Sequence, residues 1–291
     1  MRWALALTIG VALLELGGGL AAHSLALVTD AAHVGMDAVA LGIAVAAAIQ
    51  GSRPPTDRQS YGFARFEIIA ALVNGMLLFG ITAVIVVEAV RRFASPELPG
   101  GEIMFAVAAV GFAVNVGIGM MLLRSARKDM NVRAALFHVG SDAVGALSVA
   151  IGGIVLLVTR ASWIDPALSL FVAAIILIGV VRIVGEAVGV LLESAPAHAA
   201  ISVVRQRMAA LPGVEAIHDL HVWTIGSGEH VLSAHVILSD ARISEASAIL
   251  QQIEQRVRSE FAIGHVTVQF ECKTCAQDEA IVCTQRPDGG K

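Results

Sequence analysis

The sequence has few charged residues, no excess of basic ones and very little cysteine. Charged residues make up 15% of its 291 residues and hydrophobic residues 56%, and the mean hydropathy is +0.76. This composition indicates an integral membrane protein, with the lipid bilayer as its surroundings. The formal net charge of −4 provides no basic surface. We therefore expect no nucleic acid partner.

Only three cysteines occur, and all of them follow Glu271. Three cysteines at one end of a chain do not form a disulfide framework. If this end lies in the cytosol, its cysteines are in a reducing compartment and are free to bind metal. The Cys272-Lys-Thr-Cys275 spacing is a weak metal-binding signal alone, but Glu271 precedes it and Cys283 follows it.

Six apolar segments are each long enough to cross a bilayer, which takes roughly 20 residues. They are residues 3–22, 24–49, 63–90, 102–123, 134–158 and 166–192. The first could instead be a signal peptide, since Arg2 precedes it and small residues end it, although Glu15 interrupts it. We predict an all-α transmembrane domain of six spans over residues 1–193.

The distribution of Lys and Arg between the loops predicts the orientation of these spans, because cytoplasmic loops carry more of both. One side has Arg2, Arg53, Arg58, Arg124, Arg127, Lys128 and Arg133, and the other has Arg91, Arg92 and Arg160. Six spans place both termini on the same side. We expect both termini in the cytoplasm and the protein in a prokaryotic inner membrane, although the adjacent Arg91 and Arg92 oppose this orientation.

Two spans each carry a histidine and an aspartate one helical turn apart. His33 and Asp37 lie in the second span, and His138 and Asp142 lie in the fifth. Residues four apart share one face of a helix. Together the two pairs would give the two imidazoles and two carboxylates that suit Zn²⁺. Ionisable groups at membrane depth usually mark an ion or proton pathway. Asp30 lies near the same face, where it would serve the outer mouth of the site or form a hydrogen bond to a neighbouring helix.

The composition changes to that of a soluble domain after residue 193. A predicted helix at 199–211 precedes strands at 214–225 and 230–238, then a helix at 244–261 and a strand at 266–270. This order predicts a small two-layer α+β domain over residues 194–275, with both helices on one face of the sheet. We expect the polar tail, residues 276–291, to be mostly unstructured.

The sequence resembles the cation diffusion facilitators in several segments. These are LALVTDAAHVGMDAVAL, YGFARFEIIAALVNG, NVRAALFHVGSDAVGAL, GVEAIHDLHVWTIGSGEHVLSAHV and HVTVQFE. The resemblance implies a homodimer whose cytoplasmic domains have a ferredoxin-like, metallochaperone-like fold. It also implies export of divalent metal from the cytosol in exchange for protons. His33, Asp37, His138 and Asp142 match the transport-site positions of zinc-preferring members.

The resemblance implies two further groups of residues. His218, His235 and Glu271 match positions that bind a regulatory metal, and Cys272 and Cys275 could extend that site. Arg65 and Glu193 match a charged interlock near the dimer axis, although two unrelated charges at the membrane surface would give the same pattern. His221 would point to the opposite face of a regular strand from His218, and His265 lies beside a ligand position of some relatives.

The sequence also lacks features that some members of this family carry. The connector 124–133 has no histidine-rich insert, and residues 51–62 have no histidine for a second membrane-proximal site. The sequence therefore predicts one transport site and one cytoplasmic site, with Zn²⁺ as substrate and as a possible regulatory ligand.

We interpret the chain as a proton-coupled zinc exporter, and therefore as a secondary transporter and not an enzyme. One alternative is a membrane-tethered metal sensor, and another is an exporter that prefers Cd²⁺, Co²⁺ or Fe²⁺. An intramembrane metalloenzyme is disfavoured for two reasons. The chain has no HExxH sequence, and two His with two Asp leave no open zinc position for catalysis.

Overall fold

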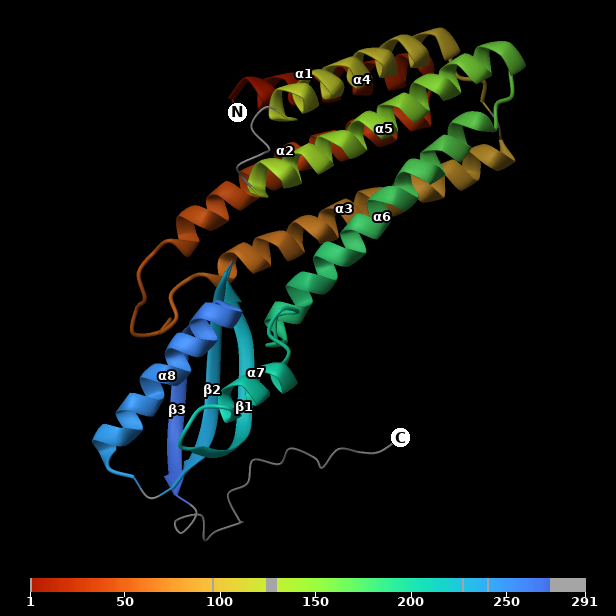
Figure 1. Ribbon diagram of the computed structural model, residues 1–291. Helices are drawn as coiled ribbons and strands as arrows, with labels where there is room; N and C mark the ends of the chain where they lie inside the picture. Colours follow the sequence, from red (N-terminus) through yellow and green to blue (C-terminus); the bar gives the residue numbers. More distant parts are fainter. Residues whose placement is uncertain (1, 96, 124–129, 227, 240, 273–291) are drawn as a thin grey trace, which may run out of the picture. The chain divides into compact units, whose positions relative to one another are not determined.

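Figure 1 shows a computed structural model of the chain, which describes all residues except 1, 96, 124–129, 227, 240 and 273–291. The chain divides into two compact units. One unit consists of Met1–Ala46 and Ala70–Val184, and the other of Ala47–Ile69 and Gly185–Lys291. The polar tail predicted to be unstructured lies outside the described residues.

Six long helices form where the sequence predicts membrane spans. They are α1 (Arg2–Ala22), α2 (Leu25–Gly51), α3 (Arg65–Ala94), α4 (Gly101–Leu123), α5 (Met130–Thr159) and α6 (Ile164–Leu191). Among the described residues, α2 to α6 contain segments long and apolar enough to cross a membrane, so this is an integral membrane protein. The described apolar part of α1, Ala6–Ala22, is shorter. The complete six-span arrangement therefore stays a prediction.

Helix α5 begins earlier than the sequence predicts. The expected connector covered residues 124–133, but the helix already includes Met130. The prediction followed the apolar run, which begins at residue 134. A helix needs only its backbone hydrogen bonds to continue, so polar residues such as Asn131 and Arg133 can form a first turn ahead of that run.

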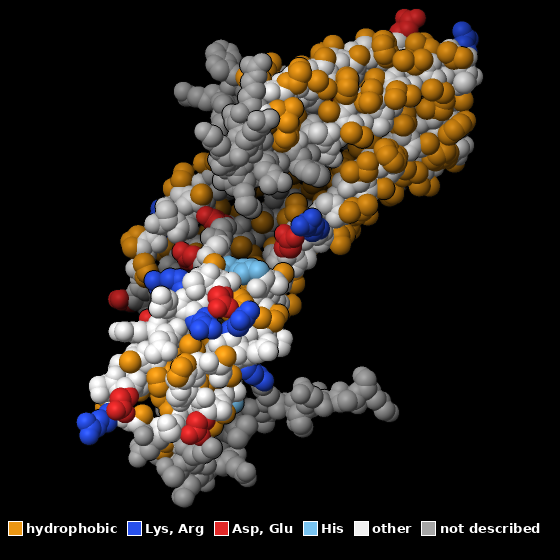
Figure 2. Space-filling model, viewed as in Figure 1, with side chains coloured by type: hydrophobic (Ala, Val, Ile, Leu, Met, Phe, Trp, Pro, Cys, Tyr) orange, Lys and Arg blue, Asp and Glu red, His pale blue; other side chains and the backbone are white. Residues whose placement is uncertain are grey.

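The helices of the first unit share two apolar cores. Side chains from α2, α4 and α5 form one core: Ala26, Leu27, Met104, Val107, Ala108, Val149, Ala150 and Leu156. Val172, Ile176 and Val180 of α6 form the second, with Leu78 of α3 packed against it. Hydrophobic side chains also cover much of the visible surface of the long helices in Figure 2, as expected of helices that face lipid. The sequence's nearly unbroken apolar runs thus serve both helix packing and lipid contact.

A glycine permits close packing between α4 and α5. A Cβ atom at Gly153 of α5 would lie 2.8 Å from the backbone nitrogen of Phe105 in α4 and 3.1 Å from the carbonyl oxygen of Gly101. Backbone atoms cannot move aside as a flexible side chain can. Only glycine therefore allows these two helices their observed approach, a common use of small residues between membrane helices.

The C-terminal elements have the predicted order of helix, strand, strand, helix and strand. They are α7 (Ile201–Ala209), β1 (Val214–Gly226), β2 (Glu229–Leu238), α8 (Ile243–Phe261) and β3 (Ile263–Cys272). The sheet order is β1-β2-β3, with β1 antiparallel and β3 parallel to β2. A parallel neighbour requires a crossover connection, which α8 provides. This is the predicted type of small α+β domain.

Both helices of this domain pack on one face of the sheet. The shared core contains Val204 and Met208 of α7, Ile253 and Val257 of α8, and alternate residues of β2 such as Leu232 and Val236. Because successive strand residues point to opposite faces, His235 lies on the other face of the sheet. The sequence pattern of β2 therefore provides one face for the core and another for polar chemistry.

Candidate metal centres

The two histidine and aspartate pairs predicted from the sequence lie together in the structure. His33 Nε2 lies 3.9 Å from Asp37 Oδ2 within α2 and 3.7 Å from Asp142 Oδ1 in α5. His138 Nε2 lies 3.2 Å from Asp37 Oδ2 and 3.7 Å from Asp142 Oδ2. Each histidine thus faces both carboxylates, and the four side chains form one cluster between the two helices.

The spacing of this cluster is close to what a tetrahedral cation needs. Zinc ligands at 2.0–2.1 Å from the metal lie roughly 3.4 Å from one another. Candidate ligand atoms of His33, Asp37 and Asp142 lie within 4.8 Å of one another. The two imidazole rings lie farther apart, with their centroids 6.2 Å from each other, and the His138 side chain is 50% exposed. Binding a metal through all four side chains would require the two imidazoles to approach each other.

Two buried atoms of this cluster lack hydrogen-bond partners among the described residues. They are Oδ1 of Asp142 and Nδ1 of His33, and the Asp142 side chain is only 9% exposed. A buried carboxylate oxygen without a partner is unfavourable. A divalent cation would satisfy the oxygen, so the residues present fit a metal as substrate.

Two further acids lie buried in the same unit. Asp30 of α2 is 3% exposed, and its Oδ1 lies 3.6 Å from the position of a Cβ at Gly145 in α5. Glu15 of α1 is 1% exposed and packs against Gly111 of α4. Asp30 lies near the predicted ligand face, whereas Glu15 stands out in the sequence only as an interruption of an apolar run. Its burial depends on contact between two helices, which the spacing within one helix does not reveal.

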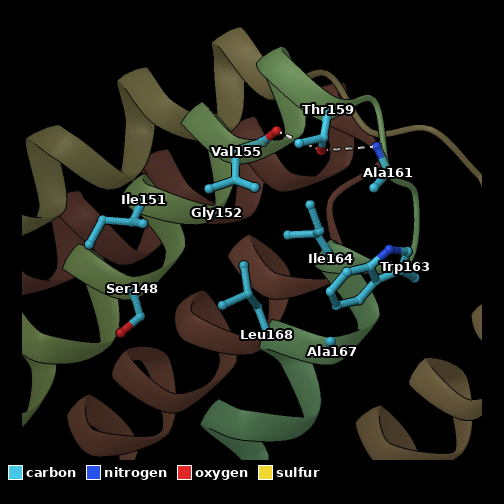
Figure 3. Close-up of a pocket in the computed structure, with 10 residues that line it drawn as sticks. All are labelled: Ser148, Ile151, Gly152, Val155, Thr159, Ala161, Trp163, Ile164, Ala167 and Leu168. Atoms are coloured by element: carbon cyan, nitrogen blue, oxygen red, sulfur yellow. Dashed lines mark hydrogen bonds between the residues drawn. The ribbon is translucent and has the colours of Figure 1, made fainter.

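An apolar groove between α5 and α6 does not contain these groups. It has a volume of about 370 Å³ (Figure 3) and is lined by Ser148, Ile151, Gly152, Val155, Thr159, Ala161, Trp163, Ile164, Ala167 and Leu168. None of these ten residues is His, Cys, Asp or Glu, the side chains that bind divalent metals in proteins. This groove therefore offers no side chain that binds divalent metal, in contrast to the four-residue cluster.

A second cluster lies on the sheet face opposite α7 and α8. His218 Nε2 lies 3.0 Å from Glu271 Oε2, and His235 Nδ1 lies 2.8 Å from Glu271 Oε1. The centroids of the two imidazole rings are 5.1 Å apart. One candidate ligand atom from each of the three residues lies within 4.8 Å of the other two. The structure thus brings together the three residues that the sequence predicts to bind a regulatory metal.

Glu271 accepts hydrogen bonds from both histidines. Burial raises the pKa of Glu271, but the hydrogen bond and charge of His218, together with those of His235, outweigh burial and lower this pKa below its ordinary value. The amide of Gln269 also donates to Oε1, at 3.1 Å. The carboxyl group is therefore held ionised, as a metal ligand must be.

A bulge in β1 adds residues to this face that a regular strand would not place there. The strand register shifts between His218 and His221, and Asp219 has a positive φ of 49°. His218 pairs with His235, and His221 pairs with Ser233, two residues away on β2. His218 and His221 therefore lie on the same face of the sheet, and not on opposite faces as in a regular strand. Asp219 Oδ1 lies 2.9 Å from His221 Nε2, and Asp219 Oδ2 lies 3.8 Å from His235 Nε2. An aspartate with positive φ has no reliable sequence signal, so this site residue was missed.

The remaining predicted residues have different surroundings. Cys272 is disulfide-bonded in the structure and in that form cannot act as a thiolate ligand. Cys275 and Cys283 lie outside the described residues. The His265 ring packs edge-on against Tyr61, with centroids 5.8 Å apart. Arg65 Nη2 donates to Glu193 Oε1 at 3.1 Å, with side chains 40% and 62% exposed.

Known sequences match almost the whole chain. The cation efflux transmembrane domain matches residues 1–192, and the cytoplasmic domain of cation efflux proteins matches residues 196–273. The chain is 37% identical over 281 residues to the metal cation efflux system protein CzcD of Cupriavidus metallidurans, which is 96% of this chain and 88% of that protein.

Two other relatives carry names that describe transport. Identity is 35% to the zinc transporter ZitB of Escherichia coli, covering 94% of this chain and 88% of that protein. Identity is 32% to a cadmium, cobalt and zinc/H(+)-K(+) antiporter of Bacillus velezensis, covering 96% of this chain and 90% of that protein. The resemblance drawn from the sequence is therefore confirmed: the chain belongs to the cation efflux family, the cation diffusion facilitators, and is a secondary transporter of metal cations and not an enzyme.

Proposed function

We propose that this protein is a proton-coupled antiporter that exports Zn²⁺ from the cytosol. The observation that carries this proposal is the convergence of two His/Asp pairs, from α2 and α5, into one partly buried cluster. These four residues, His33, Asp37, His138 and Asp142, are the proposed transport site. A site built from two separate membrane helices can change its geometry when the helices move, as transport requires.

The donor set favours zinc over harder cations. Two imidazole nitrogens and two carboxylate oxygens complete a tetrahedral shell that Zn²⁺ accepts, whereas Mg²⁺ and Mn²⁺ prefer all-oxygen sites. The names of two relatives include zinc, and one of these also includes cadmium and cobalt. Export of Cd²⁺, Co²⁺ or Fe²⁺ is the alternative, and relative transport rates decide between them.

Proton coupling follows from the chemistry of the same four groups. Metal binding requires neutral imidazole and ionised carboxylate, so protons and metal compete for the site. A site that binds metal when open to the cytosol and protons when open to the outside would couple the two gradients. Rocking of helix groups around a central site is the motion we infer by analogy with other transporters.

The proposed membrane orientation places both termini in the cytoplasm of a prokaryotic cell, with the protein in the inner membrane. It depends on the excess of Lys and Arg on one side of the chain. We assign residues 1–193 to the six-span transport domain, 194–275 to a cytoplasmic ferredoxin-like domain and 276–291 to a tail. The two matched family domains support a boundary near residue 194.

The cytoplasmic domain is proposed to join two copies of the chain and to bind regulatory zinc. His218, His235 and Glu271 are the proposed ligands, and Cys272 and Cys275 would take part only in their reduced form. Arg65 and Glu193 are proposed as the interlock near the dimer axis. The polar cluster on the sheet face opposite α7 and α8 supports the metal-binding part of this proposal.

A membrane-tethered metal sensor is the second candidate function. The cytoplasmic cluster alone would suffice for sensing. The buried cluster on α2 and α5 favours transport, because a sensor needs no ligands at membrane depth.

Uptake into inside-out vesicles tests the proposal. Vesicles with purified protein should accumulate Zn²⁺ faster than Mn²⁺, and an imposed pH gradient, acidic inside, should increase the rate. Cd²⁺ and Co²⁺ in parallel determine the preferred cargo. No metal uptake under any gradient, by protein that still binds zinc, would favour the sensor.

A further inference from the structure

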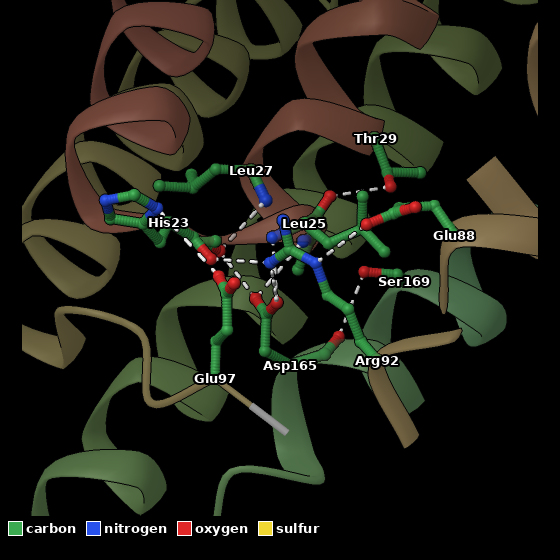
Figure 4. Close-up of polar contacts among 11 residues, drawn as sticks. His23, Leu25, Leu27, Thr29, Glu88, Arg92, Glu97, Asp165 and Ser169 are labelled. Carbon is green, nitrogen blue, oxygen red and sulfur yellow. Dashed lines mark hydrogen bonds and ion pairs between the residues drawn. The ribbon is translucent and has the colours of Figure 1, made fainter. Parts of the chain in front are cut away.

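A buried carboxylate from α6 lies at the N-terminus of α2. Asp165 is 0% exposed and accepts three hydrogen bonds from the start of α2 (Figure 4). The Ser24 hydroxyl donates to Oδ1 at 2.6 Å, the Leu25 amide to Oδ2 at 2.7 Å and the Ala26 amide to Oδ1 at 3.2 Å. Asp165 thus binds the end of a helix that is distant from it in sequence.

These contacts meet two requirements of a helix N-terminus. Its first amides have no partners within the helix, and its dipole favours a nearby negative charge. Ser24 is the local capping residue, and its Oγ accepts a hydrogen bond from the Leu27 amide at 3.3 Å. Asp165 supplies acceptors for the Leu25 and Ala26 amides together with the negative charge. The N-terminus of α2 is therefore capped jointly by its own serine and by α6.

The same carboxylate also joins α3 to this network. Arg92 Nη1 lies 3.7 Å from Asp165 Oδ2 and donates to the His23 carbonyl oxygen at 2.6 Å, while Arg92 Nε lies 3.5 Å from Glu88 Oε1. α3 and α6 share one apolar core, and α2, α4 and α5 share the other. The network is thus a polar junction between the two groups of helices.

This junction lies on the helix that carries half of the proposed transport site. His33 lies eight positions after Leu25, which corresponds to roughly 12 Å along an α-helix. The helix runs without interruption from Leu25 to Gly51. Any rotation or shift of its first turn would therefore displace His33 and Asp37 relative to His138 and Asp142.

We infer that Asp165 is a positioning residue for transport, which holds α2 at the depth and rotation that place His33 and Asp37 against the ligands of α5. This inference depends on the proposed function. Asp165 acts through α2 and does not touch the metal. Its loss should therefore weaken the affinity for zinc, because two of the four ligands are misplaced.

The first test compares Asp165→Asn with the wild-type protein in zinc uptake by inside-out vesicles. The amide keeps the shape of the side chain but loses its charge and one acceptor oxygen. We expect the KM for zinc to rise roughly tenfold or more, because small misplacements of reacting groups have large effects. Ser24→Ala removes one of the three bonds and should raise KM less.

Ser169→Ala is the matched control. Ser169 is also 0% exposed on α6, and its hydroxyl donates to the Asp165 carbonyl oxygen at 3.0 Å, not to the carboxylate. A buried polar change that leaves the cap intact should leave KM close to the wild-type value. An equal rise in KM for Ser169→Ala and Asp165→Asn would contradict a specific role of the carboxylate.

An exchange of side chains separates positioning from a direct role in ion movement. The double variant Ser24→Asp/Asp165→Ser moves the carboxylate to the capping residue of α2, where Arg92 is near. It should recover most of the affinity that Asp165→Ser loses, measured at equal amounts of monodisperse protein. A double variant no better than Asp165→Ser would overturn the inference, as would a normal KM in Asp165→Asn. Absence of uptake by the wild type would instead reject the proposed function.

Discussion

His33 of α2 and Asp142 of α5 face each other although their helices are far apart in sequence. His33 Nε2 lies 3.7 Å from Asp142 Oδ1. Each residue also has a partner one turn along its own helix, namely Asp37 and His138. The cluster therefore depends on the relative position of α2 and α5. A movement between these helices would separate the ligands, and the proposed transport site would release its cargo in this way.

Replacing one imidazole by a carboxylate should change metal preference. His138→Asp converts two nitrogens and two oxygens into one nitrogen and three oxygens, which suits harder cations. We expect the rate of Mn²⁺ uptake to rise relative to Zn²⁺, by roughly tenfold if one ligand contributes about 1.4 kcal/mol of discrimination. Competition between the two metals in vesicles measures this ratio. An unchanged ratio would mean that selectivity is determined elsewhere.

The cytoplasmic cluster should bind zinc independently of the membrane helices. Residues 194–291 contain the complete α+β core, so this fragment should fold and gain about 2.7 kcal/mol when zinc is present at 100 times its dissociation constant. His235→Ala should abolish the gain, and His230→Ala, outside the cluster, should not. A melting curve unaffected by zinc would leave this domain only its proposed role in dimerisation.

The cysteines provide a separate test of the same site. Under reducing conditions, Cys272→Ser/Cys275→Ser should lower the number or affinity of bound zinc ions if the thiolates are ligands. Equilibrium dialysis of the fragment measures the stoichiometry. An unchanged stoichiometry and affinity would remove both cysteines from the site and leave His218, His235 and Glu271.

The contact between Arg65 and Glu193 should matter for transport more than for stability. Both side chains are partly exposed, and pairs of this kind contribute only about 0.2–1 kcal/mol to folding. We expect Arg65→Glu to reduce zinc flux with little change in melting temperature, and Arg65→Glu/Glu193→Arg to restore part of the flux. Independent losses in the double variant would show that the pair has no shared role.

The stability of the metal-free fragment should fall as the solution becomes mildly acidic. Burial, and then the charge of nearby His198, lower the pKa of His230 below its ordinary value of 6.5. The unfolded chain therefore takes up a proton near pH 6.5 while the folded domain does not, so stability present above this pH is lost below it. His230→Gln should show a smaller drop in melting temperature between pH 7 and 5. His265→Gln is the control, because this exposed histidine has its ring partner, Tyr61, outside the fragment. Equal slopes in all three proteins would contradict this assignment.

The sequence predicted which residues share a helix face but not how the helices meet. Four-residue spacing was sufficient to pair His33 with Asp37 and His138 with Asp142. The four ligands that a tetrahedral cation takes indicated that the two pairs meet, as the family resemblance also implies. The helix, strand, strand, helix, strand order of the C-terminal domain was also predicted from patterns within single segments. These predictions succeeded because each depends only on the regular geometry of one element.

Residues whose roles depend on contacts between elements, or on irregular backbone, were missed. Asp165 is an ordinary acid at a predicted helix start, and its distant partners at Ser24 and Arg92 appear only once α2, α3 and α6 are packed. Asp219 reaches the cytoplasmic cluster through a strand bulge at a non-glycine residue. Neither spacing nor composition encodes such contacts, so only the structure reveals them.

Zinc uptake by Asp142→Ala under a pH gradient is the most direct test of the transport site. Asp142 contributes a buried carboxylate oxygen without a hydrogen-bond partner among the described residues, so its removal should cost affinity for metal and little packing. Inside-out vesicles with an acidic interior should accumulate zinc with the wild-type protein and with Ser141→Ala, the adjacent exposed position. Vesicles with equal amounts of folded Asp142→Ala should show background uptake, whereas wild-type uptake by this variant would contradict the assignment of the site.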